Sequence, residues 1–135
     1  MESINPVAVL VAAAVYFVLG GLWYSPMLFA RPWMALMGTT EEDIKKKGGA
    51  GKAYAVALIS SLIIAYVLAI FITRVQPANL FSGAETGLMA GLGFSAMTSF
   101  TTSTFEDRPL KLFLIDSGYN LVGLVIAGAI LGAWH

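Results

Sequence analysis

One carboxylate lies well inside an apolar stretch near the end of the chain. Asp116 is flanked by apolar residues, and Tyr119, Asn120 and Gly123 follow it at spacings that share one face of an α-helix. An ionisable side chain is costly to place in a membrane span and commonly marks a site for protons or ions. The sequence therefore predicts a polar intramembrane site, centred on Asp116, that binds a proton or a cation.

Hydroxyl side chains gather in the preceding apolar run. Only a short charged turn, residues 106–109, separates this run from the next, so two antiparallel helices are expected. That pairing brings residue 99 opposite residue 116, and Ser99 and Thr102 are predicted to join the same polar cluster. Such clusters also join membrane helices without any further role. The sequence leaves both interpretations open.

A second pair of charges flanks the turn before this run. Arg74 ends one apolar run, and Glu85 lies near the start of the following one. We expect either an ion pair between Arg74 and Glu85 or an acid that extends to the lipid headgroups.

Metal and enzyme chemistry have few candidate residues. The chain has no cysteine, and its single histidine is His135, so thiolate nucleophiles and histidine metal sites are not expected. The acidic residues 41–43 are consecutive and would point in different directions. Thr39 and Glu42 are spaced as a helix-capping pair, which explains these acids without a metal. The sequence predicts no metal, no cofactor and, most simply, no enzymatic activity.

Composition places the site in a lipid bilayer. Of 135 residues, 58% are hydrophobic and 12% are charged, against about 25% charged in ordinary soluble domains. The formal net charge is zero, which gives no field to attract nucleic acid. We expect one all-α integral membrane domain, residues 1–135, with a short interfacial or cytoplasmic helical segment between its first two spans. The four expected transmembrane helices are residues 6–24, 53–74, 83–105 and 110–134.

Small residues recur at every fourth position in the second and third predicted spans. Small residues at this GxxxG-like spacing let two membrane helices approach closely. The two stripes are expected to face one another across the short turn that joins these spans. Their members are Ala57, Ser61 and Ala65 in one span and Gly83, Gly87, Gly91 and Ser95 in the other.

Basic residues predict an orientation. Five of them lie in residues 25–52 and two lie at or just past the turn 106–109, whereas only Arg74 is on the other side. Lysine and arginine are retained on the cytoplasmic side of a membrane. We therefore expect an inner (plasma) membrane protein with both loops, 25–52 and 106–109, in the cytoplasm and both termini outside.

Several local motifs resemble a known family. They are the GGLWYSP segment at residues 20–26, then Phe29, Trp33 and Gly38, and later Arg108-Pro109 and Gly118-Tyr119. Together they resemble a bacterial family of small four-helix membrane proteins that is catalogued only as a domain of unknown function. The resemblance covers nearly the whole chain. It implies a membrane fold and transfers no catalytic residue.

Two functions remain in nearly equal contention. One is an oligomeric transporter or channel-like protein that uses the Asp116 face for protons or cations. The other is an accessory or structural subunit that packs against a larger membrane complex through its small-residue faces. The expected partners are thus the lipid bilayer and either further copies of the chain or a larger complex. Co-purification from gently solubilised membranes would discriminate between the two.

Overall fold

The fold is a bundle of helices. A computed structural model describes residues 4–46, 51–74 and 78–134, which form helices, turns and short connections. In chain order, the α-helices are α1 (Pro6–Trp23), α2 (Ala30–Met37), α3 (Glu41–Lys46), α4 (Gly51–Thr73), α5 (Leu80–Ala90), α6 (Met97–Phe105) and α7 (Leu110–Ala133). A π-helical segment, η1 (Gly91–Ala96), joins α5 to α6.

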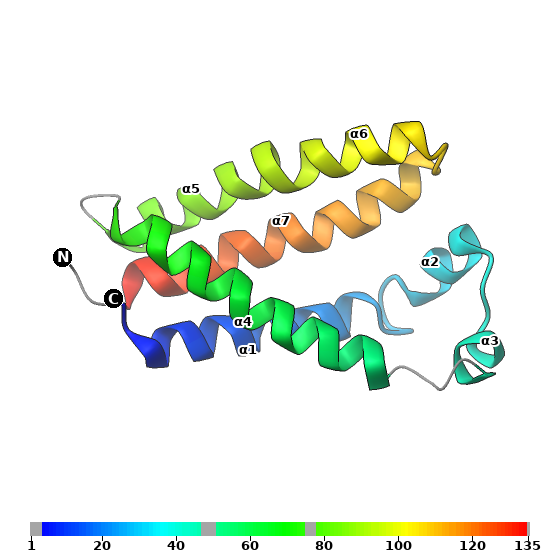
Figure 1. The fold of residues 1–135 in the computed structure, drawn as a ribbon, viewed down its shortest axis with the longest axis horizontal. Helices are drawn as coiled ribbons and strands as arrows, with labels where there is room; N and C mark the ends of the chain where they lie inside the picture. Colours follow the sequence, from blue (N-terminus) through cyan, green and yellow to red (C-terminus); the bar gives the residue numbers. More distant parts are fainter. Residues whose placement is uncertain (1–3, 47–50, 75–77, 135) are drawn as a thin grey trace.

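Helix α7 lies at the centre of the bundle. It packs against α5 and η1 on one side and against α1 and α4 on the other (Figure 1). The buried core is built where α1, α4 and α7 meet, and small side chains dominate it. Its members are Ala8, Val9, Ala12 and Ala13 from α1, Ala65, Leu68, Ala69 and Ile72 from α4, and Ala127 and Leu131 from α7.

Three helices of the described residues, not the expected four, are long and apolar enough to cross a membrane. They are α1, α4 and α7, and each begins and ends within two residues of a predicted span. The fourth span expected at 83–105 does not appear as a single helix, because α5, η1 and α6 share this region and none of them alone reaches spanning length. The hydroxyl-rich sequence of α6 also makes it less apolar than the other three helices.

Local capping explains where the first helices begin and end. The Asn5 side chain accepts hydrogen bonds from the backbone amides of Val7 (3.0 Å) and Ala8 (3.3 Å), which starts α1. Gly38, with φ of 70°, ends α2. The predicted capping pair of α3 is wrong by one residue. Thr40 and Asp43, rather than Thr39 and Glu42, exchange the two capping hydrogen bonds, at 3.1 and 3.2 Å.

The glycines of α5 approach α7 and not α4, contrary to the prediction. A Cβ atom on Gly83 would overlap the Gly128 carbonyl group and would lie 2.9 Å from Cα of Gly132. A Cβ atom on Gly87 would lie 2.6 Å from the carbonyl carbon of Leu124. Glycine on both helices allows a closer backbone contact than the alanines of α4 could provide.

The other small residues of the predicted stripes lie in different surroundings. On α4, Ala65 belongs to the core shared with α1, Ser61 is buried and Ala57 is exposed. In η1, Gly91 is buried against the Leu121 side chain and Ser95 is half-buried. The two stripes therefore have separate partners.

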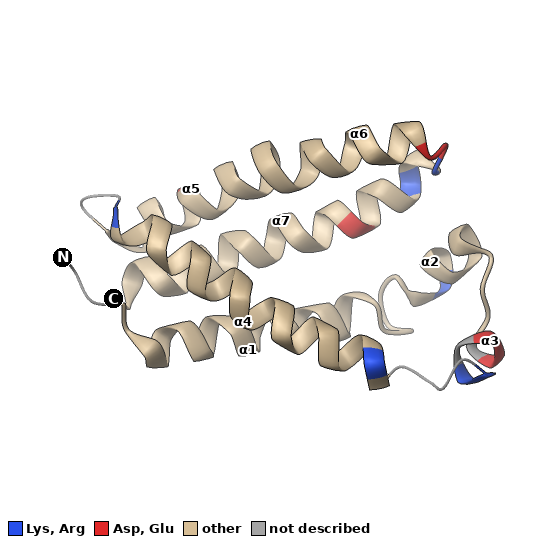
Figure 2. Ribbon diagram, in the orientation of Figure 1, with Lys and Arg blue, Asp and Glu red and all other residues tan. Residues whose placement is uncertain are grey.

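The two ends of the bundle differ in charge. Residues Asn5, Thr73 and Trp134 border one small cavity, so the start of α1 and the ends of α4 and α7 lie together (Figure 1). The opposite end carries α2, α3 and the α6–α7 turn (Figure 2). Among the described basic residues, Arg74 alone lies at the first end. Those at the opposite end are Arg31, Lys45, Lys46, Lys52, Arg108 and Lys111.

Candidate functional site

Asp116 binds a tyrosine that follows α1. The Tyr24 hydroxyl donates a hydrogen bond of 2.7 Å to Oδ1 of Asp116, which lies two turns into α7. Tyr24 comes directly after α1, where the chain turns toward Ser25-Pro26. A phenol can donate this hydrogen bond and an ionised carboxylate can only accept it, so Tyr24 is the donor.

The rest of the predicted polar face also turns toward α1. The Tyr16 hydroxyl donates to Oδ1 of Asn120 at 2.7 Å, and the Tyr119 hydroxyl donates to the backbone carbonyl of Tyr16 at 2.9 Å. Trp23 donates its indole N–H to the Ile115 carbonyl at 2.9 Å. With the Tyr24–Asp116 contact, these hydrogen bonds join α1 to the first half of α7.

Glycines make room for the aromatic rings between these helices. A Cβ atom on Gly20 would lie 2.7 Å from the Tyr119 hydroxyl oxygen, and one on Gly123 would lie 2.6 Å from Cε2 of Tyr16. The Tyr16 and Tyr119 rings can therefore pack with their centroids 5.0 Å apart. Tyr24 adds an edge-on contact to Tyr119 at 5.7 Å.

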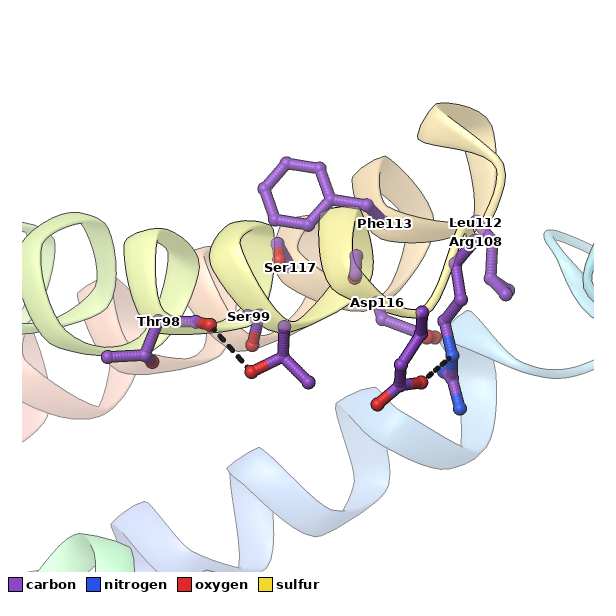
Figure 3. Close-up of a pocket in the computed structure, with 10 residues that line it drawn as sticks. Thr98, Ser99, Arg108, Leu112, Phe113, Asp116 and Ser117 are labelled. Atoms are coloured by element: carbon purple, nitrogen blue, oxygen red, sulfur yellow. Dashed lines mark hydrogen bonds and ion pairs between the residues drawn. The ribbon is translucent and has the colours of Figure 1, made fainter.

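A cavity of about 340 Å³ lies beside Asp116, between α6 and α7 (Figure 3). Its lining combines hydroxyls of α6, the charged turn that follows, and the first turns of α7. The lining residues are Thr98, Ser99, Thr102, Ser103, Glu106, Arg108, Leu112, Phe113, Asp116 and Ser117. The predicted cluster members Ser99 and Thr102 thus share a cavity with Asp116.

The hydroxyls of α6 do not bind Asp116, however. Thr102 donates to the Thr98 carbonyl at 3.1 Å, and Thr98 donates to the carbonyls of Phe94 and, at 3.0 Å, Ser95. These bonds to the preceding turn satisfy each hydroxyl hydrogen locally. Nothing then draws these side chains onto Asp116, and tyrosine takes that place.

An ion pair between Arg108 and Glu106 lies at the edge of the cavity. Arg108 Nε is 2.8 Å from Oε2 of Glu106, and both side chains are about half exposed. The predicted ion pair between Arg74 and Glu85 is not formed. The structure describes both residues, leaves both exposed and records no contact between their charged groups.

The described residues offer no cluster suited to a tightly held metal. No three histidine, aspartate or glutamate side chains come together within them. Asp116 is accordingly a single carboxylate in a cavity of hydroxyls, an arrangement that can take up one proton or bind one positive charge.

Sequence reasoning missed the α1 side of the site. Tyr16, Gly20 and Trp23 share one face of α1, and their spacing of four and three residues was a usable signal. The pattern is polar and aromatic on a helix that is otherwise aliphatic. Tyr24 lies one residue further on, in the GGLWYSP segment, and its spacing did not indicate a contact with Asp116.

Comparison with known proteins gives a family and no activity. Neither a curated protein nor a solved structure matches the chain. A family model matches residues 7–132, which is nearly the whole length. The chain belongs to the family described as protein of unknown function (DUF1761).

Proposed function

We propose that this chain is a small membrane protein that transports protons or cations, with Asp116 as the binding group. The observation that carries the proposal is the position of the Asp116 carboxylate on a hydroxyl-lined cavity. Asp116 lies about 9 Å along α7 from Leu110, at a rise of about 1.5 Å per residue. A carboxylate at that depth, with access to a cavity, suits a site that loads and releases a positive charge.

The geometry of the carboxylate supports reversible binding. Tyr24 holds one oxygen, Oδ1, at 2.7 Å. No hydrogen bond from a described residue reaches the second oxygen, Oδ2. A proton or a cation can therefore bind at Oδ2 while Tyr24 keeps the carboxyl group in place.

We further propose that the cavity opens toward the cytoplasm. It adjoins the α6–α7 turn, at the end of the bundle that carries most of the basic residues (Figure 2). The positive-inside rule assigns that end to the cytoplasmic face of a plasma membrane and both termini to the outside. This topology needs an even number of crossings, so α5, η1 and α6, which follow one another without a break, would cross as one segment.

Flux measurements in liposomes test the proposal. Wild-type protein should carry protons or a monovalent cation down an imposed gradient, and Asp116→Asn should abolish this flux because it removes the charge. Glu85→Gln is the matched control, since it neutralises an exposed acid far from the cavity. Equal flux in the wild type and Asp116→Asn would refute a role for this carboxylate in transport.

A second candidate function is that of a subunit in a larger assembly. Helix α6 supports it, because none of its residues is buried within the chain and Phe100 and Phe105 are exposed on it. Further copies of the chain or a larger membrane protein could cover that surface. Gentle solubilisation of native membranes should recover a homo-oligomer if the chain is a transporter, and a stoichiometric larger complex if it is an accessory subunit.

A further inference from the structure

The size of the cavity beside Asp116 exceeds what a bare ion requires. Its volume of about 340 Å³ has room for about ten water molecules at about 30 Å³ each. Sites for small organic ligands begin at about 300 Å³. The described residues also hold no group of three histidine, aspartate or glutamate side chains that could bind a metal ion. The space fits a molecule of several non-hydrogen atoms.

The charges around the cavity favour a single positive charge on that molecule. Glu106 and Arg108 neutralise one another through their 2.8 Å contact. Asp116 is the remaining charged group in the lining, and its Oδ2 receives no hydrogen bond from a described residue. A monovalent cation would thus balance the negative charge of Asp116 in the cavity.

The hydroxyls favour a ligand that donates hydrogen bonds. Thr98 and Thr102 already give their hydrogens to backbone carbonyls of α6. Each hydroxyl oxygen therefore presents only lone pairs to the cavity. A carboxylate and these two hydroxyl acceptors together complement the N–H groups of a ligand.

We propose that this cavity binds a small organic ammonium ion, whose N–H groups donate to Asp116 and to the hydroxyl oxygens of Thr98 and Thr102. Leu112, which is buried, lies along its short carbon chain. The same ammonium chemistry occurs in water-soluble monoamines and in the head group of an aminophospholipid. This inference rests on the proposed role of Asp116 and names the class of cation that it binds.

Calorimetric titration of the purified full chain tests the inference. In a nonionic detergent at neutral pH, n-butylammonium should bind with a stoichiometry near one. Tetramethylammonium, which carries the same charge without an N–H group, should bind at least tenfold more weakly. Sodium at the same concentration should not displace n-butylammonium. Equal binding of tetramethylammonium, or no binding of n-butylammonium, would overturn the inference.

Variants locate the site. Asp116→Asn should remove n-butylammonium binding. Thr102→Val should weaken it by on the order of tenfold, because a hydrogen bond to a charged group is lost. Thr101→Val is the matched control. Thr101 lies on the same helix and donates to the Met97 carbonyl, but it does not line the cavity, so binding should be unchanged. Equal effects of the two threonine substitutions would place the ligand elsewhere.

An experiment in lipid nanodiscs distinguishes a water-soluble amine from a lipid head group as the source of the ammonium group. The titration is repeated in nanodiscs of phosphatidylglycerol with and without phosphatidylethanolamine. Suppression of n-butylammonium binding by phosphatidylethanolamine identifies the lipid head group, and unchanged binding identifies a soluble amine. Flux that depends on Asp116 without amine binding would overturn only this inference. Amine binding at Asp116 without any flux would overturn only the transport proposal.

Discussion

The contact between Tyr24 and Asp116 determines how the carboxylate is presented. Tyr24 approaches from the end of α1 and holds Oδ1, and no described residue forms a hydrogen bond with Oδ2. The Tyr16–Asn120 bond, also 2.7 Å long, repeats the arrangement about two turns back along α1 and about one turn further along α7. At the scale of single residues, side chains of α1 and Tyr24 orient the polar face of α7. The cavity lies beside the carboxylate that Tyr24 holds.

Removing the Tyr24 hydroxyl should weaken the fold and leave Asp116 without its partner. Tyr24→Phe keeps the ring and its packing on Tyr119, and it removes the donor to a carboxylate. A hydrogen bond to a charged group contributes about 1.5–3 kcal/mol. Thermal unfolding in detergent should show a loss of that order. Tyr66→Phe, at an exposed position of α4, should have no effect. Equal stability of both variants would contradict the assigned contact.

The sequence predicted which residues form the polar face, but not their partners. Helical periodicity places Asp116, Tyr119 and Asn120 on one side of α7, and the structure agrees. Periodicity does not say which neighbouring helix that side meets. The short turn indicated Ser99 as the nearest partner of Asp116. In the structure the threonines of that helix bond their own backbone, and Tyr24 binds Asp116 instead.

Among the helices, the close contact of α5 with α7 is the feature most sensitive to side-chain size. Gly83 and Gly87 lie against the backbone of α7 near Gly128 and Gly132. A small-residue stripe in the sequence indicates that a close contact exists and leaves the partner helix open. The π-helix of η1 had no recognisable signal either, so a single span was expected where the structure has three consecutive elements.

Gly83→Ala should force α5 and α7 apart. The added Cβ atom would overlap the Gly128 carbonyl group, which is backbone and cannot rotate away. Overpacking of a close contact costs about 1–3 kcal/mol, which a lowered unfolding temperature in detergent would reveal. Gly21→Ala is the control, because nothing lies within 4 Å of its added Cβ atom. If both substitutions left the unfolding temperature unchanged, the α5–α7 contact would be wrong.

Among the described residues of the whole molecule, one end of the bundle carries most of the charged side chains and the other end carries few (Figure 2). Composition predicted a helical membrane protein, and the three long apolar helices are compatible with that class. Basic residues, the cavity and the α6–α7 turn lie together, while the start of α1 and the end of α7 lie at the other end (Figures 1 and 2). The structure thus places most of the described basic residues at one end of the bundle. From the sequence, only the number of lysines and arginines in each connection could be counted.

Single cysteine substitutions test the orientation of the bundle in the membrane, since the chain itself contains no cysteine. In intact cells an impermeant thiol reagent should label Ser3→Cys. Lys46→Cys should be labelled only after the membrane is permeabilised, because its end of the bundle is expected to face the cytoplasm. The opposite pattern of labelling would reverse the orientation and would place the Asp116 cavity on the outer side.

Infrared difference spectroscopy tests the role of Asp116 most directly, because it detects the carboxylate itself. Addition of acid or of n-butylammonium to the wild-type protein should change the carboxylate stretching bands. The contribution of Asp116 to this change should be absent in Asp116→Asn and present in Asp107→Asn, which removes an exposed acid of the α6–α7 turn. If the Asp116→Asn spectrum kept the full wild-type change, Asp116 would be a structural partner of Tyr24 and would not be the binding site.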